Sequence, residues 1–431
     1  MSDTGTDSAT GTDSGTDAPP AAPGAELAPD PRLLVRERGL AGYLEDFRRR
    51  IRGGELGSIP VVIGLIIIAI VFEAQTGTFL TPRNLSNISI YIAGPGIMAV
   101  GIVLVLLLGE IDLSIGSVAG LSAAIWAVLT VSHGVDDVLA ILLALLAGAA
   151  VGTIHGVFFA KVGVPAFVVT LAGFLGWSGV QIWVMGEEGT INIPRDSWVR
   201  DFGDFYFSDI AAAYSLAAIL TAGYVLTLWR GERRRAAAKL TSRPLSEILV
   251  RGALVAIASF VTAYTLNQHR GLPLALVLFL AVLLLADFMV RRTTYGRQIF
   301  AVGGNAEAAR RAGINVERVR LTVFTIAGAL AAFGGLFFAA QSGGASKSLG
   351  SGNLLMNVIA AAVIGGTSLF GGRGWIWSAL LGTLVIQSIT SGLNLMNMSA
   401  EIQYMITGAV LLIAVVLDSV SRRTQRTAGR T

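Results

Sequence analysis

A short polar segment, residues 109–117, interrupts two long apolar runs and carries the side chains best suited to binding a polar solute. Carboxylates within a membrane are unfavourable unless they face water, protein or solute, and this segment holds Glu110 and Asp112. Asp112 or Ser114 is expected to cap a following helix, whose N–H groups and positive dipole end then face the solute. We therefore expect Glu110, Asp112, Ser114 and Ser117 to shape a solute pathway or its gate. The alternative is a turn at the cytoplasmic surface in which Asp112 is only a cap.

Two further interruptions of the apolar runs point to the same kind of pathway. Pro95, between two glycines, removes an intrahelical hydrogen bond and is expected to break its helix. A second glycine-rich break covers residues 365–374. Broken helices in distant parts of a chain are typical of a transport pathway. The residues assigned to the pathway or its gate from these two breaks are Gly94, Pro95, Gly96, Gly365, Gly366 and Thr367.

The segment 291–318 predicts a short helix with a cap at each end. A glycine pair is expected to form a turn, after which Asn305 is a favourable N-cap, Glu307 suits the positive dipole end and Gly313 closes the helix. Such a helix is a compact knob that a partner protein could grip, whereas a plain connector would not need both caps. The residues assigned to this contact are Gly303, Gly304, Asn305, Glu307, Ala308, Ala309, Ala312 and Gly313.

The apolar runs between these segments predict an all-α, polytopic membrane bundle. Of the 431 residues, 53% are hydrophobic and 14% are charged, whereas a soluble domain has roughly a quarter of its residues charged. Uncharged runs of about 20 residues match a hydrocarbon core of roughly 30 Å. We expect about 12 transmembrane spans, with roughly 10–12 compatible with the pattern. They lie near residues 59–80, 86–108, 114–132, 138–160, 164–185, 209–229, 248–266, 271–290, 319–341, 354–370, 375–393 and 401–419.

The chain divides into four expected segments. Residues 1–31 are a low-complexity tail expected to be disordered. Residues 32–58 form a basic interfacial segment, or only a basic flank of the first span. Residues 59–419 form the transmembrane domain, and residues 420–431 form a basic cytoplasmic tail.

The basic residues define an expected orientation in the membrane. Most of the 32 lysines and arginines fall on one side of the predicted spans, so the positive-inside rule places both termini in the cytoplasm. This distribution explains the net charge of +4 without a nucleic-acid partner. The basic residues expected outside are Arg83, Arg195, Arg200, Arg270 and Lys347.

The sequence groups no residues for catalysis or nucleotide binding. It contains no Gly-x-x-x-x-Gly-Lys-Ser/Thr motif, no cysteine and only three widely separated histidines. Few carboxylates lie inside the predicted spans, so the usual equipment for proton or sodium coupling is sparse. We expect neither an enzyme nor a bound cofactor or metal, and any energy for pumping would come from another subunit.

The outer loop, residues 186–208, combines acidic and aromatic side chains. Such a surface could dock a soluble partner outside the membrane. The alternative is a solvated connector.

Several motifs together resemble those of bacterial ABC sugar importer permeases of the ribose/xylose family. Residues 110–117 are similar to the family's signature, and residues 295–314 are similar to its coupling loop. Residues 164–173 and 364–374 also fit. The resemblance covers essentially the whole chain after the N-terminal tail. The chain is most similar to D-xylose permeases, which have extra helices before the coupling loop, as residues 209–266 would supply.

The resemblance implies a pore subunit of an ATP-driven importer in the bacterial cytoplasmic membrane, carrying a monosaccharide such as xylose. Two permease copies would form the pore, an ATPase pair would bind ATP and grip residues 305–313 of the coupling loop (291–318), and an extracytoplasmic sugar-binding protein would dock outside. Leu355-Met356-Asn357 departs from the Glu-Leu-Asp of many sugar permeases, so the sugar stays open. A twelve-span secondary sugar carrier and a passive channel are the alternatives.

Overall fold

The structure is a computed structural model that describes residues 59–238 and 245–427. The segments predicted at 1–31 and 32–58, and residues 428–431 of the tail, lie outside the described residues. The α-helices are α2 (Ile59–Thr76), α3 (Pro82–Tyr91), α4 (Ala93–Leu107), α5 (Ile115–Ala127), α6 (Asp137–Val157), α7 (Ala166–Met185), α8 (Trp198–Asp204), α9 (Ile210–Ala237), α10 (Leu245–Asn267), α11 (Leu274–Arg292), α12 (Thr294–Gly304), α13 (Ala306–Arg311), α14 (Val316–Ser342), α15 (Asn353–Ile364), α16 (Ser378–Leu395) and α17 (Ala400–Thr427). The π-helical turns η1 (Val128–Ser132) and η2 (Phe158–Val162) extend α5 and α6.

The predicted helical membrane bundle is confirmed. Within the described chain, nine helices are long and apolar enough to cross a membrane, and the pair α3 and α4, bent by 42°, would be a tenth if it counts as one span. The two other predicted spans, 354–370 and 401–419, correspond to the shorter apolar helix α15 and to the Ala400–Ile413 part of α17. Helix α15 ends at Ile364 because Gly366 follows with φ of +105°, outside the helical region.

Helices α6 and α14 pack closely because small residues line their contact. Gly148, Gly152 and Gly156 recur every four residues on one face of α6. A Cβ on Gly148 would lie 2.5 Å from the carbonyl oxygen of Gly328, and one on Gly152 would lie 2.1 Å from that of Phe324. Small residues at this spacing allow close backbone approach, which is the usual source of helix association in lipid.

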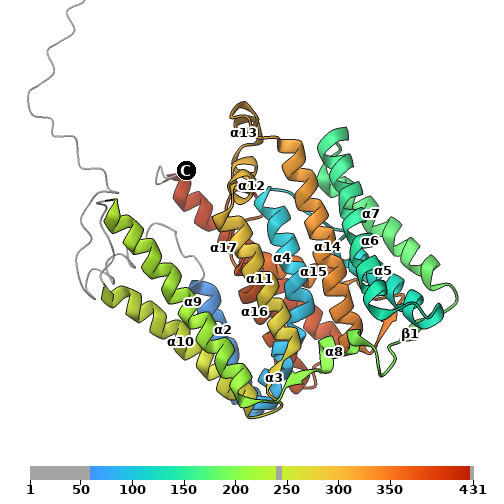
Figure 1. Cartoon of the computed structure of the whole chain (residues 1–431), viewed down its shortest axis with the longest axis horizontal. Helices are drawn as coiled ribbons and strands as arrows, with labels where there is room; N and C mark the ends of the chain where they lie inside the picture. The colour runs from blue at the N-terminus through green and yellow to red at the C-terminus, as the bar shows by residue number, and fades with distance from the viewer. Residues whose placement is uncertain (1–58, 239–244, 428–431) are drawn as a thin grey trace, which may run out of the picture. The chain divides into compact units, whose positions relative to one another are not determined.

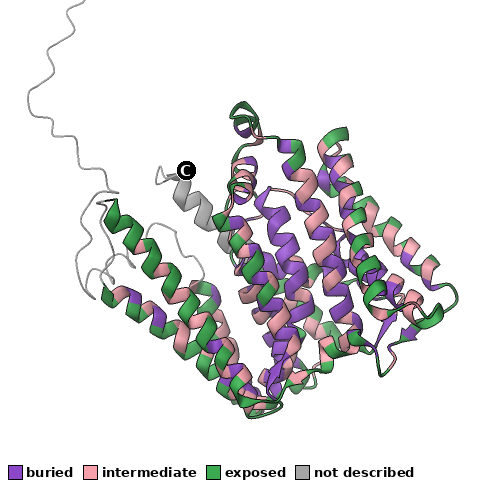
Figure 2. Ribbon diagram, viewed as in Figure 1, coloured by how far each residue is buried: buried purple, intermediate pink, exposed green. Residues whose placement is uncertain are grey.

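Helix α4 is buried along nearly its whole length, with α11, α14, α15 and α16 packed around it (Figure 2). Helices α9 and α10 instead expose most of their residues and pack mainly on each other. Thr221 Oγ1 and Ser259 Oγ are 3.1 Å apart across this pair, and the rings of Tyr214 and Phe260 stack with centroids 6.1 Å apart. The core of the bundle therefore lies around α4 and α14.

The bundle has two structurally distinct ends, which we call the α13 end and the α8 end (Figure 1). Short antiparallel strand pairs lie at the α8 end. Strand β1 (Thr190–Asn192) pairs with β4 (Gly344–Ser346), and β2 (Tyr206–Phe207) pairs with β3 (Leu272–Pro273). Helix α14 runs from the α13 end to the α8 end (Figure 1).

The predicted outer loop, 186–208, is fastened to the α8 end. The Oδ1 atom of Asp137 accepts a hydrogen bond from Trp126 Nε1 at 2.7 Å. Its Oδ2 atom accepts from Ser197 Oγ at 2.8 Å and from the backbone N–H of Trp198 at 2.6 Å. One carboxylate at the start of α6 therefore holds both α5 and the loop.

Candidate functional site

The polar segment 109–117 is held by its own side chains at the start of α5. Asp112 Oδ1 accepts hydrogen bonds from the backbone N–H of Ser114 at 2.7 Å and from Ser114 Oγ at 2.6 Å. Ser114 occupies the N-cap position, but its hydroxyl is directed to Asp112. Ser117 Oγ donates to the carbonyl oxygen of Ser114 at 2.8 Å. Asp112, Ser114 and Ser117 are all buried, so their polar groups serve mainly to fix the segment.

A directed chain of hydrogen bonds joins this segment to α6 and α7. An indole N–H only donates, and Trp177 Nε1 lies 2.8 Å from His155 Nε2, which must accept. A neutral His155 then carries its proton on Nδ1, which lies 3.2 Å from Ser114 Oγ. The hydroxyl of Ser114 in turn donates a hydrogen bond to Asp112 Oδ1. The chain therefore runs Trp177 to His155 to Ser114 to Asp112, and it selects one histidine tautomer.

Gly173 makes room for this series of hydrogen bonds. A Cβ on Gly173 would lie 2.3 Å from His155 Nε2, so a larger residue would displace the imidazole. Sequence reasoning singled out neither His155 nor Trp177 as a site residue. The available signal was a histidine inside the apolar run 138–160, because a polar side chain inside a span usually has a partner.

Glu110 forms an ion pair with Arg320 of α14. Its Oε1 atom lies 3.8 Å from Arg320 Nη2, and both side chains are about a quarter exposed. Burial raises the pKa of Glu110, and the Arg320 guanidinium partly opposes that rise. Arg320 also lies over the ring of Phe159, 4.4 Å from its centroid. Glu110 follows α4 and faces the first turns of α14 at the α13 end.

Three glycine-rich segments meet beside the polar segment. The backbone N–H of Gly372 donates to the carbonyl oxygen of Leu107 at 3.0 Å. A Cβ on Gly371 would lie 2.7 Å from the Cα of Gly109 and from the carbonyl oxygen of Gly303. A Cβ on Gly303 itself would lie 1.7 Å from the Leu107 carbonyl oxygen. The second predicted break and the coupling loop therefore contact the base of the polar segment through bare backbone.

The second break, 365–374, is also locked internally. Thr367 Oγ1 and Ser378 Oγ lie 2.6 Å apart, and both side chains are buried. A Cβ on Gly365 would lie 1.9 Å from the carbonyl oxygen of Ser378. Gly366 has a φ of +105°, which a residue with a side chain rarely adopts. The break is thus a fixed turn between α15 and α16.

The coupling loop forms two helices, α12 and α13. Gly303 and Gly304 are the last residues of α12, so the prediction that they form a turn is wrong. The change of direction falls at Asn305, which is extended at φ −160° and caps α13 by accepting from the N–H of Ala308 at 2.9 Å. Gly313 closes α13 at φ +83°, as predicted.

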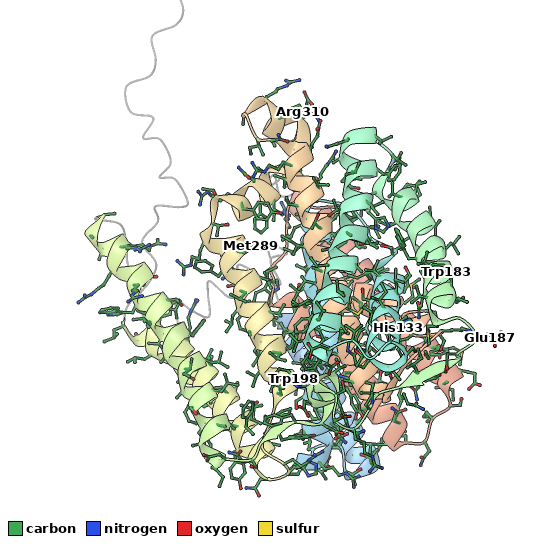
Figure 3. All side chains as sticks on the ribbon, turned by 45° about the vertical axis from the view of Figure 1, so that its right-hand side comes forward. His133, Trp183, Glu187, Trp198, Met289 and Arg310 are labelled. Carbon is green, nitrogen blue, oxygen red and sulfur yellow. The ribbon has the colours of Figure 1, made fainter. Side chains whose placement is uncertain are left out.

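Helix α13 is an exposed knob with an internal charge network. Glu307 pairs with Arg310 at 3.1 Å and with Arg311 at 3.3 Å. Ala308 and Ala312 are exposed and Ala309 is buried against the rest of the chain. Figure 3 shows Arg310 at the tip of this knob.

Gly94, Pro95 and Gly96 lie apart from these residues, because they occupy the first turn of α4 and the polar segment follows its last. The bend precedes them, at Ile92 between α3 and α4. A Cβ on Gly96 would lie 2.3 Å from the Phe279 ring. These glycines serve the packing of α4 against α11 and α14.

The described residues offer no grouping of three or more histidine or carboxylate side chains of the kind that binds a metal ion. The polar atoms of the polar segment and of the second break are engaged with one another. The polar segment is therefore fixed by its own hydrogen bonds, and it lies against the end of α12, which leads into the exposed helix α13.

Comparisons with known proteins identify the family of the chain. Residues 84–415 match the family described as branched-chain amino acid transport system / permease component. The xylose transport system permease protein XylH of Escherichia coli (strain K12) is 38% identical over 366 residues, covering 84% of this chain and 92% of that protein. XylH of Haemophilus influenzae is 35% identical over 372 residues, covering 85% and 98%.

A ribose permease is also similar. The ribose import permease protein RbsC of Escherichia coli (strain K12) is 31% identical over 359 residues, covering 83% of this chain and 92% of that protein. No solved structure matches the chain. The chain belongs to this family of transport-system permease components, and it is a non-catalytic, multi-pass membrane permease subunit.

Proposed function

We propose that this chain forms half of the membrane pore of an ATP-driven importer for a monosaccharide, with a pentose such as xylose as the substrate. The names of the xylose and ribose permeases that it resembles support the pentose. A second copy would complete the pore, and an extracytoplasmic sugar-binding protein would deliver the solute. ATP would bind to a separate ATPase pair, and this chain would carry no cofactor.

The observation that carries the proposal is the contact between Gly303 and the Leu107 carbonyl oxygen. Helix α12 ends at Gly304 and α13 starts two residues later, so movement of α13 would be passed to Gly303. Leu107 is the last residue of α4, at the base of the polar segment. Because the contact is backbone against backbone, no flexible side chain lies between the two helices, and a movement of α12 would displace the end of α4. An ATPase gripping α13 would thereby act on the polar segment.

The polar segment would act as a gate. Asp112 and Ser114 already use their polar atoms on each other and on His155, which leaves them little capacity to bind a sugar. Glu110 is more exposed and pairs with Arg320. If Asp112→Asn and Glu110→Gln together left uptake unchanged at normal expression, the gate role would be wrong.

The α13 end would face the cytoplasm of a bacterial cell, with both chain termini on that side. The positive-inside rule supports this orientation. At this end the basic residues are concentrated at the end of α11 and on α12, α13 and the start of α14: Arg291, Arg292, Arg297, Arg310, Arg311, Arg318 and Arg320.

Copurification tests the proposal. A tagged chain isolated from its own cells should bring down an ATPase subunit, and the reconstituted complex should take up xylose only with ATP and the binding protein. Uptake by the chain alone down a gradient would favour a passive channel. Uptake driven by an ion gradient would favour a secondary carrier.

A further inference from the structure

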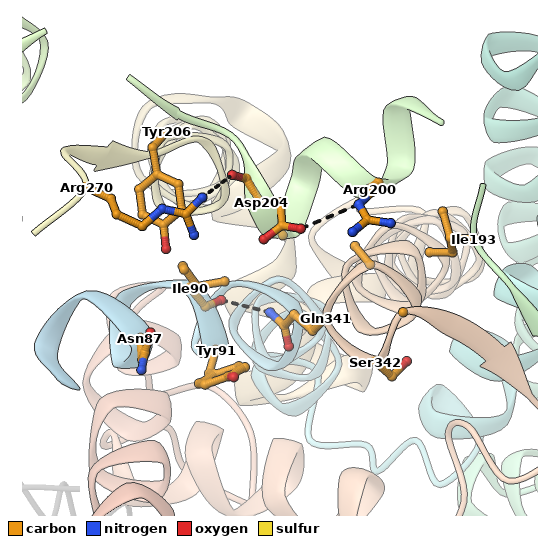
Figure 4. Close-up of a pocket in the computed structure, with 13 residues that line it drawn as sticks. Asn87, Ile90, Tyr91, Ile193, Arg200, Asp204, Tyr206, Arg270, Gln341 and Ser342 are labelled. Carbon is orange, nitrogen blue, oxygen red and sulfur yellow. Dashed lines mark hydrogen bonds and ion pairs between the residues drawn. The ribbon is translucent and has the colours of Figure 1, made fainter. Parts of the chain in front are cut away.

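A polar cavity of about 340 Å³ opens at the α8 end of the bundle, between the last turns of α3 and α14 and the helix α8. We call it the outer pocket. Figure 4 shows one wall made by α8 and the segments after it, and a facing wall made by α3 and α14. Its polar lining includes Asn87, Tyr91, Arg200, Asp204, Arg270 and Gln341.

Both walls of the outer pocket are fixed by contacts within the chain. Gln341 Nε2 donates to the carbonyl oxygen of Ile90 at 2.9 Å, which ties α14 to α3. Arg270 lies over the ring of Tyr206 at 4.0 Å and donates to the backbone carbonyl oxygen of Asp204 at 3.4 Å. The pairing of β2 with β3 holds these two segments together. The pocket is therefore largely formed before any ligand arrives.

The lining offers donors and acceptors of mixed type. Arg200 and Asp204 form an ion pair at 3.6 Å, so one of the two guanidinium groups is balanced. The amide of Asn87 and the hydroxyl of Tyr91 add groups that donate and accept. Adjacent sugar hydroxyls also do both. The other guanidinium, that of Arg270, is engaged with the Tyr206 ring and the carbonyl oxygen of Asp204.

The volume suits a small solute. A cavity of about 340 Å³ lies at the small end of the range of roughly 300–1,000 Å³ that small-molecule sites span.

Helix α8 connects the outer pocket to a closed aromatic cluster. Arg200 and Asp204 line the pocket, while Phe202 between them stacks on Phe337 of α14 with centroids 5.0 Å apart. Phe333 packs against both rings, at 6.1 Å and 5.2 Å. A solute that binds Arg200 or Asp204 would therefore contact the helix that carries Phe202 into this cluster.

The outer pocket and the gate share one helix. Arg320, which holds Glu110, and Gln341, which lines the pocket, are both on α14. They are separated by roughly 30 Å along the helix at about 1.5 Å per residue, which is the thickness of a hydrocarbon core. We propose that the outer pocket is a receiving site for a neutral polyhydroxylated solute, a monosaccharide, before it reaches the gate. This inference rests on the proposed function.

The test uses the full chain with its ATPase subunit in lipid nanodiscs, and saturation-transfer NMR with xylose, ribose or leucine as the probe. Xylose should give a signal that falls about fivefold or more in Arg270→Gln and in Asn87→Ala, because each variant loses a hydrogen-bonding group. Arg195→Gln, on the outer loop 186–208 but outside the pocket lining, should keep the wild-type signal. ATPase copurification shows that each variant is folded.

Wild-type sugar signals in both pocket variants would overturn the receiving site. Xylose transport by the wild-type complex would in that case leave the proposed function standing. A signal with leucine that depends on Arg270 would also overturn the sugar assignment. Absence of both sugar transport and sugar signal would overturn the receiving site and the proposed function together.

Discussion

The indole N–H of Trp177 donates to Nε2 of His155 across 2.8 Å, and this bond decides which nitrogen of the imidazole faces the polar segment. With Nε2 occupied as an acceptor, Nδ1 is the donor toward Ser114. The relationship links α7 to the start of α5 through α6. Displacement of α7 would thus reach Asp112 through hydrogen bonds alone.

Trp177→Phe should destabilise the polar segment 109–117 that we propose as the gate. The substitution keeps an aromatic ring but leaves His155 Nε2 buried without its donor, which costs about 1–3 kcal/mol. We expect a lower unfolding temperature in detergent and reduced uptake by the reconstituted complex. Trp183→Phe is the matched control, because Trp183 is on the same helix and 80% exposed. Equal behaviour of the two variants would show that the bond does not matter.

Gly173→Ala should be more harmful than Gly176→Ala. A Cβ on Gly173 would lie 2.3 Å from His155 Nε2, whereas one on Gly176 meets no atom of the described chain within 4 Å. Alanine at Gly176 should even favour the helix by up to about 1 kcal/mol. Uptake and thermal stability of the two variants provide the measurement. The prediction fails if Gly173→Ala retains wild-type values in both.

The Glu110 carboxyl predicts a pH dependence of stability. Burial raises its pKa in the folded chain, and Arg320 opposes the rise. An acid with a raised folded pKa binds its proton more tightly when folded, so its contribution to stability is present at low pH and is lost as pH rises through the folded pKa. The unfolding temperature of Glu110→Gln should therefore exceed that of the wild type increasingly from about pH 4 upward.

The variant Arg320→Gln tests the same pH dependence of stability through the partner of Glu110. Without the cation the pKa of Glu110 should rise further, so the loss of stability should extend to higher pH. Parallel pH profiles for the wild type and Glu110→Gln would contradict the assignment.

Glu307→Lys should abolish uptake. The change replaces two ion pairs on α13 by three neighbouring cations and places a positive charge at the positive end of the helix dipole. We expect loss of ATPase copurification with normal membrane insertion and normal docking of the binding protein. Glu317→Lys makes the same change in the exposed first turn of α14 and should be tolerated. Retained sugar-stimulated ATPase activity in Glu307→Lys would count against α13 as the coupling helix.

Local sequence patterns predicted the helices and the caps of α13. Asn305 and Gly313 act through hydrogen bonds and backbone angles within a few residues, so their roles can be read from the chain itself. The turn expected at Gly303 and Gly304 was wrong because both residues belong to α12, in which Gly303 packs against the end of α4. Glycine propensity is a weak signal where tertiary contacts oppose it.

The contacts that build the site could not be predicted from spacing. His155 meets Ser114 across 41 residues, and Gly303 meets Leu107 from a different helix. Such pairings depend on how the helices cross, which periodicity does not specify. The sequence did mark the polar segment 109–117 and the second break 365–374, and the structure brings Gly109 of the first against Gly371 of the second. The span predicted at 86–108 already separated Gly94 and Gly96 from residues 109–117, although the broken helices favoured one shared pathway.

The most direct test of the coupling route compares Gly303→Ala with Gly304→Ala in the reconstituted complex. A Cβ on Gly303 would lie 1.7 Å from the Leu107 carbonyl oxygen, whereas one on Gly304 meets nothing in the described chain within 4 Å. ATP-driven xylose uptake and sugar-stimulated ATPase activity are measured at matched expression. The account predicts that Gly303→Ala loses at least about tenfold in uptake, equivalent to about 1.4 kcal/mol, while still binding the ATPase, and that Gly304→Ala behaves as the wild type. Wild-type uptake by Gly303→Ala would contradict it.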